Sequence, residues 1–261
     1  MNKVLLTLMV AATFIICGPR IGLAEDAEES TKTLFGDFLK EKNIDVTVAG
    51  TADFYNKYIW RGFVLDDDIV FQPGFSVSAA GFTVSGWGNF DLENKDALAS
   101  DEIDTTISYT FSPVEKLNLT IGHIYYAFLQ SSTFAKEVYG SIGLSTFLSP
   151  VLSYYYDYSE QSQGGGDGQY LAFDISQSIM LIPEYKISLN LGAHAGYNNE
   201  DFINGKGGDL LGTAGIAVPL TPNLTMTPKV AYAVPLDDLA NANDGNQRER
   251  IYGGVSMAYT F

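Results

Sequence analysis

The sequence predicts an all-β protein, a transmembrane antiparallel up-and-down β-barrel of about 12 strands behind a short N-terminal periplasmic segment. Two patterns predict this fold. Between residues 44 and 261, apolar and polar side chains alternate with the period of two that belongs to a strand with one apolar face. The connections between these alternating segments are short and long in turn, as in barrels of the bacterial outer membrane.

Residues 1–24 have the pattern of a secretory signal peptide. Lys3 precedes an apolar run from Val4 to Cys17, and Gly22-Leu23-Ala24 supplies the small residues of a cleavage site. The run is shorter than the roughly 18 apolar residues expected of a membrane-spanning helix. We therefore expect export and removal of this segment, together with the only cysteine of the chain.

Residues 25–43 form a predicted periplasmic segment. It begins with an acidic stretch, and Leu34, Phe35, Phe38 and Leu39 then follow helical spacing. Two interpretations remain open for this segment: a short helix at the mouth of the barrel, or a flexible tail.

The barrel domain is predicted over residues 44–261. Its alternating segments span roughly 44–55, 69–78, 82–92, 102–111, 117–128, 136–147, 151–159, 168–180, 185–198, 207–219, 223–234 and 248–261. At ~3.3 Å per residue and a tilt near 40°, a strand of about 10 to 14 residues crosses roughly 25–35 Å, the height of an apolar membrane band.

The predicted connections fall into two classes. The short ones are 79–81, 112–116, 148–150, 181–184 and 220–222, and each contains proline or glycine, which favour tight turns. The longer, polar ones are 56–68, 93–101, 129–135, 160–167, 199–206 and 235–247. This sorting indicates turns on the periplasmic side and loops on the outer side. A soluble β-sandwich would not be expected to sort its connections by length.

Three residues depart from this pattern. Pro73 and Pro228 fall inside predicted strands, where each removes a hydrogen bond of the ladder, so we expect a bulge or a bent register there. His123 falls on the lipid-facing side of its strand.

The last predicted strand ends on Tyr259-Thr260-Phe261. A terminal aromatic two residues after a tyrosine resembles the closing strand of Gram-negative outer-membrane β-barrels. The resemblance implies that Tyr259 and Phe261 belong to the signal read by the barrel-insertion machinery. We accordingly expect an outer-membrane location, with lipid and lipopolysaccharide as surroundings; the alternative for this segment alone is a half-buried strand of a soluble sandwich.

Charge and cysteine content exclude some classes of partner. Without Lys3 and Arg20 the chain keeps 13 basic residues against 31 acidic ones, a net charge of −18, which repels nucleic acid. Without Cys17 it has neither disulfides nor thiolate metal ligands, and we predict no metal and no cofactor. Acidic loops such as Asp66-Asp67-Asp68 leave two interpretations, a divalent-cation site or solvated surface.

Polar side chains on the other face of each strand are predicted to line the interior. The predicted pore-lining residues are Asp53, Lys57, Arg61, Gln72, Trp87, Asn89, Asp91, Asp104, Glu137, Tyr139, Tyr155, Asp157, Asp174, Lys186, Asn190, His194, Lys229, Arg248 and Arg250. Charges of both signs fit a water-filled, selective conduit, and they equally fit a barrel closed by internal ion pairs.

Several short segments support a family resemblance. Tyr58-Ile59-Trp60-Arg61-Gly62, Gln72-Pro73-Gly74 and Gly86-Trp87-Gly88 occur in order, and Tyr125-Tyr126, Glu137-Val138-Tyr139 and Tyr155-Tyr156-Asp157 follow. Together they resemble exported Gram-negative proteins known as TorF-type porins, over about residues 44–261. The resemblance implies an outer-membrane barrel and gives no particular substrate.

The predicted function is a porin-like channel for passive diffusion of small polar or charged solutes. Arg61 is expected on the interior wall beside Lys57, near Arg248 and Arg250, as a basic constriction; the alternative is that it pairs with Asp53 or Asp91. Two other functions stay open: a closed structural or surface-binding barrel acting through its acidic loops, and a lipid-modifying enzyme. We predict no enzyme, because neither histidine has a serine as its next neighbour on the same face.

Overall fold

The computed structural model describes residues 44–93, 101–160, 166–202, 205–245 and 247–261. Residues 47–261 form one compact unit, and the description below concerns that unit. The predicted signal peptide, 1–24, and the predicted periplasmic segment, 25–43, lie outside the described residues.

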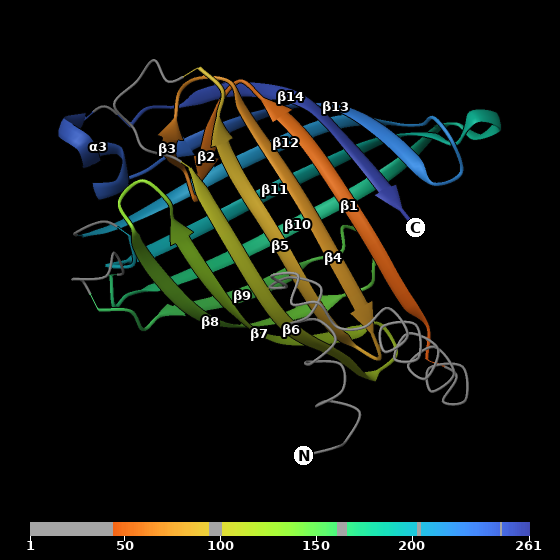
Figure 1. The fold of residues 1–261 in the computed structure, drawn as a ribbon, viewed down its shortest axis with the longest axis horizontal. Coiled ribbons are helices and arrows are strands. Elements are labelled where there is room, and N and C mark those ends of the chain that lie inside the picture. Colours follow the sequence, from red (N-terminus) through yellow and green to blue (C-terminus); the bar gives the residue numbers. More distant parts are fainter. Residues whose placement is uncertain (1–43, 94–100, 161–165, 203–204, 246) are drawn as a thin grey trace, which may run out of the picture. The chain divides into compact units, whose positions relative to one another are not determined.

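Within the described residues, twelve antiparallel strands close into one barrel (Figure 1). They are β1 (Val46–Tyr55), β4 (Val70–Ala79), β5 (Phe82–Asp91), β6 (Glu102–Val114), β7 (Leu117–Phe128), β8 (Thr133–Leu144), β9 (Val151–Asp157), β10 (Gln169–Ile182), β11 (Ile187–Asn199), β12 (Lys206–Pro219), β13 (Leu224–Pro235) and β14 (Arg250–Thr260). Each strand is a neighbour of the next barrel strand in the sequence, and β1 closes the ring between β4 and β14. The predicted fold class and strand number are therefore confirmed.

The short turns all lie at one end of the barrel, here the turn end, and the longer connections lie at the other, the loop end. Three elements at the loop end fall inside predicted loops: strands β2 (Tyr58–Trp60) and β3 (Phe63–Asp66), which form a hairpin, and helix α3 (Asp238–Gly245). Figure 1 shows these elements gathered at the same end. At the turn end, a 3₁₀ turn, η2 (Pro183–Tyr185), joins β10 to β11.

The expected bulges at Pro73 and Pro228 are wrong. Phe71 pairs with Phe90 and Gly74 with Trp87, which is one register on both sides of Pro73. Pro228 itself stands opposite Val255 in an unshifted ladder with β14. Each proline therefore removes one hydrogen bond without inserting an extra residue. A backbone N–H bonds to only one of the two neighbouring strands, so the remaining bonds of both ladders keep the register.

The outward face of the barrel is apolar and rich in aromatic rings. Along β10, Leu171 and Phe173 are exposed, whereas the alternate residues Tyr170 and Ala172 are buried inside the barrel. Phe82 and Tyr109 pack at 4.5 Å between ring centroids near the turn end. The described residues contain no helix of the length and hydropathy needed to cross a bilayer. The hydrophobic surface that the alternation predicts lies on the outward face of the strands.

The interior differs between the two ends. Near the loop end, the inward side chains of Gln72, Asn89 and Asn198 are buried. Near the turn end, inward Ser176 and Ser178 are exposed although they lie inside the ring of strands. Small, accessible residues therefore line one half of the interior, and the other half is filled by side chains.

Candidate functional site

The β2–β3 hairpin turns on two residues, Arg61 and Gly62. Trp60 pairs with Phe63, which leaves a two-residue loop between the strands. Both loop residues have positive φ, 47° for Arg61 and 74° for Gly62, as a type I′ turn requires. A Cβ on Gly62 would lie 2.4 Å from Cβ of Asp209 on β12, so glycine allows the tip to approach the barrel wall.

Side chains of the hairpin contact successive strands of the barrel. The Tyr58 hydroxyl donates to Oε2 of Glu102 on β6 at 3.0 Å, and its ring lies 5.4 Å from that of Trp87 on β5. Trp60 packs against Tyr126 of β7, with 6.0 Å between ring centroids. The hairpin therefore runs through the loop half of the interior from β1 and β4 toward the opposite wall.

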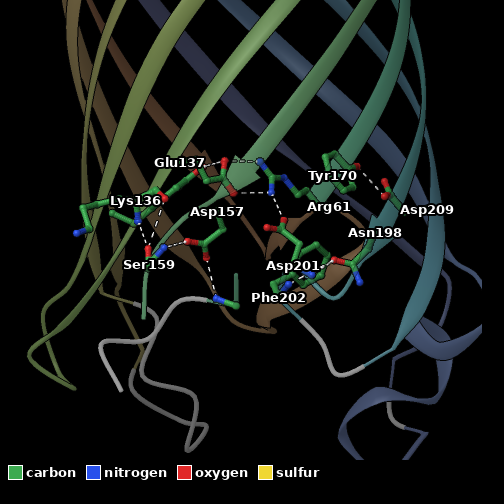
Figure 2. Close-up of polar contacts among 12 residues, drawn as sticks. Arg61, Lys136, Glu137, Asp157, Ser159, Tyr170, Asn198, Asp201, Phe202 and Asp209 are labelled. Atoms are coloured by element: carbon green, nitrogen blue, oxygen red, sulfur yellow. Dashed lines mark hydrogen bonds and ion pairs between the residues drawn. The ribbon is translucent and has the colours of Figure 1, made fainter. Parts of the chain in front are cut away.

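Arg61 fastens the tip of the hairpin to that opposite wall (Figure 2). Its Nη1 and Nη2 donate to the two carboxylate oxygens of Glu137 on β8, both at 2.7 Å, and Nη1 also donates to Oδ2 of Asp201 at 2.5 Å. The three side chains are 8%, 3% and 1% exposed, respectively. A two-point guanidinium–carboxylate contact is both strong and directional, and burial protects it from screening by salt.

Three aromatic rings surround the same guanidinium group. Its Cζ lies 4.3 Å from the ring centroid of Trp60, 4.6 Å from that of Tyr155 and 4.3 Å from that of Tyr170. Trp60 belongs to the hairpin, whereas Tyr155 and Tyr170 are paired residues of β9 and β10. Ring faces attract a cation, most strongly where water is excluded. We call Glu137, Asp201, Tyr155 and Tyr170 the guanidinium cage.

Asp201 is held in place by its own loop. The side-chain oxygen of Asn198 accepts the backbone N–H groups of Asp201, at 3.1 Å, and Phe202, at 3.3 Å. Burial raises the pKa of Asp201 to about 7; Glu137 and Asp157 raise it too, and Arg61 opposes the shift. Its second oxygen, Oδ1, is buried and has no hydrogen-bond partner among the described residues.

A second polar network adjoins the cage on β10, β11 and β12. Nδ1 of His194 lies 2.7 Å from Asp174, and its Nε2 lies 3.2 Å from Asp209. The hydroxyl of Tyr170 donates to Asp209 at 2.7 Å, so Tyr170 belongs to both networks. Acidic groups predominate in this half of the interior, and Arg61 and His194 lie among them.

Most of the predicted pore-lining residues occupy inward positions of the observed strands. These are Asp53, Gln72, Trp87, Asn89, Asp91, Asp104, Glu137, Tyr139, Tyr155, Asp157, Asp174, Asn190, His194, Lys229 and Arg250. The structure brings Glu137, Tyr155, Asp174 and His194 into the two networks above. Asn190 lies on the accessible half of the wall, and Lys229 lies over the ring of Tyr55.

Four predicted positions differ in the structure. Arg61 and Lys57 lie beyond the end of β1: Arg61 is at the hairpin tip, and Lys57 pairs with Asp67. Lys186 lies in the turn after η2, and Arg248 lies ahead of β14, where it is exposed. These four residues lie in connections, where strand alternation no longer decides which way a side chain points.

The alternative for Arg61, a pair with Asp53 or Asp91, is wrong. Arg61 contacts Glu137 and Asp201 rather than Asp53 or Asp91. Among the described contacts, Asp53 accepts a hydrogen bond from Ser256 at 2.6 Å instead. Asp201 is not among the predicted residues, because it lies in a loop and has no periodic signal. Glu102 and Asp209 were predictable, because both fall on inward positions of predicted strands.

The described residues contain no group of three or more His, Asp or Glu side chains arranged to hold a metal ion. Of the two histidines, His194 lies in the network above, and His123 faces outward with Nε2 2.6 Å from the hydroxyl of Tyr158. Within the described part of the chain, neither histidine is hydrogen-bonded to a serine.

Comparison with known proteins places the fold. No family model and no curated protein matches the chain. Among solved structures, it is similar to the NanC porin, with a TM-score of 0.51 and 10% identity over 81% of this chain and 98% of that one. It is also similar to the KdgM porin in complex with disordered oligogalacturonate, with a TM-score of 0.51 and 13% identity over 82% of this chain and 99% of that one.

The fold is thus that of outer-membrane β-barrel porins. At these identities the likeness concerns the fold alone. The resemblance of the Tyr58–Gly62 segment and its companions to TorF-type porins stays a prediction.

Proposed function

We propose that this chain is an outer-membrane channel for small polar or charged solutes, closed near its outer end by the β2–β3 hairpin. The observation that carries the proposal is the ion pair of Arg61 with Glu137 and Asp201 across the interior. A hairpin held to the wall mainly by side-chain contacts can be released, whereas the strand ladders of the barrel do not depend on it.

The two halves of the interior support this function. The accessible half carries small polar residues such as Ser176 and Ser178, which leave room for water. The filled half contains a small buried apolar cluster of Tyr55, Tyr58 and Val70 beside its polar networks. A barrel evolved only for rigidity would be expected to fill its interior along its whole length.

The membrane assignment is part of the proposal. The apolar outward face fits acyl chains, the aromatic rings near both ends fit the two interfaces, and Tyr259 and Phe261 would serve as the insertion signal. The porin fold of NanC and KdgM supports an outer-membrane location. Passage would be passive diffusion.

A closed structural barrel is the second candidate, and the burial of the Arg61 ion pair favours it. Single-channel recording in planar bilayers separates the two functions. Arg61→Gln removes one side of a buried pair, a change that typically costs about 3 kcal/mol, or about a hundredfold in the closed-to-open ratio.

We therefore expect Arg61→Gln to conduct more than the unmodified protein. Lys206→Gln is the matched control: it also removes one positive charge, from an exposed residue at the loop end, and should conduct like the unmodified protein. Absence of conductance in all three proteins would favour the structural barrel. Liposome swelling with sugars, amino acids and organic acids of graded size then defines the solute class.

A further inference from the structure

The guanidinium cage contains no residue of the hairpin. Glu137, Tyr155 and Tyr170 are inward residues of β8, β9 and β10, and Asp201 belongs to the loop after β11. Strand pairing sets the wall: Tyr139 and Tyr155 are register partners, as are Glu137 and Asp157 and, on the next ladder, Tyr155 and Tyr170. Release of the hairpin would therefore leave these side chains in position, because the barrel strands and the loop after β11 hold them.

Once Arg61 leaves, the cage is free to bind another cation. With the hairpin in place, Glu137 and Asp201 are nearly fully buried, and Asp157 lies close enough to affect the pKa of Asp201. Release of the hairpin lets water reach these carboxylates, and their neighbouring negative charges then attract a cation. Oδ1 of Asp201 is buried without a hydrogen-bond partner among the described residues even when Arg61 is present, so the cage can accept more hydrogen bonds than it receives.

The chemistry of the cage selects one kind of cation. A carboxylate that receives two parallel N–H bonds, a second carboxylate beside it and aromatic rings on the faces match a planar guanidinium group. An ammonium group could form the ion pairs but lacks the planar fork, and a neutral urea group lacks the charge.

Deepening the proposed function, on which this inference rests, we propose that the guanidinium cage is a binding site for small solutes bearing a guanidinium group. Arg61 fills the site as an internal competitor when no solute is present. A solute that occupies the cage excludes Arg61, and the hairpin loses its fastening at the opposite wall. Binding and opening are then coupled, because the solute binds only the released state.

Binding is measured by titration calorimetry on the full chain in detergent micelles, with argininamide as the probe and citrullinamide as its neutral urea counterpart. Arg61→Ala should bind argininamide at least tenfold more tightly than the unmodified protein, because the internal competitor is gone. Adding Glu137→Gln to Arg61→Ala should abolish that binding. Lys206→Gln should bind like the unmodified protein, and citrullinamide should bind to none of them.

Folding of each variant is checked by its near-ultraviolet circular dichroism. Equal affinity of folded Arg61→Ala for argininamide and citrullinamide, or no binding of either, would overturn the cage. If Arg61→Ala does not fold, the unmodified protein supplies the test in a planar bilayer. The conductance of the unmodified protein should then be higher in argininamide than in citrullinamide brought to the same ionic strength with sodium chloride. Equal conductance in the two solutions overturns the cage.

The outcomes also separate this inference from the proposed function. Binding of argininamide by a protein that never conducts keeps the cage and refutes the channel. Conductance without binding keeps the channel and refutes the cage.

Discussion

At the scale of single residues, the site combines one cation with two carboxylates. Arg61 neutralises one negative charge, so the trio with Glu137 and Asp201 would carry a net charge of −1 if both acids were ionised. A buried excess charge is costly, and the cheapest remedy is a proton on the less well paired acid. Asp201 receives one hydrogen bond from Arg61, whereas Glu137 receives two.

This arrangement makes closing of the hairpin depend on pH. Burial raises the pKa of Asp201 to about 7 in the closed arrangement, and release would return it toward its ordinary value of 3.8. Closing therefore takes up a proton between these values. The protonated Asp201 stabilises the closed hairpin fully below pH 3.8. This stabilisation declines as the pH rises and is lost above pH 7. We expect conductance to rise from pH 4 to 7 and to level off above.

The variant Asp201→Asn tests the source of that dependence. Asparagine keeps an oxygen acceptor for Arg61 and cannot titrate. The conductance of the Asp201→Asn protein should therefore not change between pH 4 and 7. Asp237→Asn, a change of equal charge in an exposed loop residue, should keep the slope. A slope that persists in Asp201→Asn would assign the titration to another group.

At the scale of elements, the hairpin depends on a turn with two positive φ angles. Gly62 has φ 74° and stands so close to Asp209 that a Cβ would contact both that residue and Leu239 of α3. The hairpin thus combines a backbone conformation that favours glycine with a contact that excludes a side chain. Closure of the hairpin against the wall depends mostly on side-chain contacts, whereas the barrel depends on the hydrogen bonds of its strand ladders.

We predict that Gly62→Ala releases the hairpin while the barrel persists. An alanine with positive φ costs about 1 kcal/mol before any clash, which is roughly a fivefold change in the closed-to-open ratio. Single-channel recording should show more frequent or longer openings. Gly212→Ala is the control, because a Cβ there would have no atom within 4 Å, and its record should match the unmodified protein. Unchanged gating in Gly62→Ala would show that closure of the channel does not depend on the turn at the hairpin tip.

At the scale of the whole molecule, the barrel and the hairpin are different kinds of structure. Each barrel strand is hydrogen-bonded on both sides, which removes every open edge and satisfies the backbone in lipid. The hairpin adds to this closed ring without completing it, since β4 and β1 are neighbours in the barrel. The barrel should therefore fold without the hairpin, although Tyr55 and Val70 would lose apolar neighbours.

Deletion of the hairpin tests this independence. Replacement of residues 57–67 by a short Gly-Ser linker should leave a barrel that resists sodium dodecyl sulfate when unheated and has a conductance several-fold above that of the unmodified protein. Adjacent strands lie ~4.8 Å apart, so a short linker can join β1 to β4. Loss of the folded band, with the unmodified protein run alongside, would show that the barrel needs the hairpin.

Much of the barrel could be predicted from the sequence. Alternation assigned the inward positions of strand residues such as Glu137, His194 and Asp157, and prolines and glycines marked the short turns. Pro73 and Pro228 show the limit of this reasoning, since a proline in a strand predicts a lost hydrogen bond but not whether the register shifts.

The sequence by itself determined the barrel. A period of two with one apolar face predicts strands that face lipid, and in lipid a sheet must close on itself to satisfy its backbone. The sequence also singled out Arg61, though not its partners. Only the tertiary structure decided that the loop after β1 turns into the interior and that Arg61 meets Glu137 and Asp201 there. The physical reason is that a loop has no periodicity, so the site forms from residues 76 and 140 positions away from Arg61 that only the closed ring brings together.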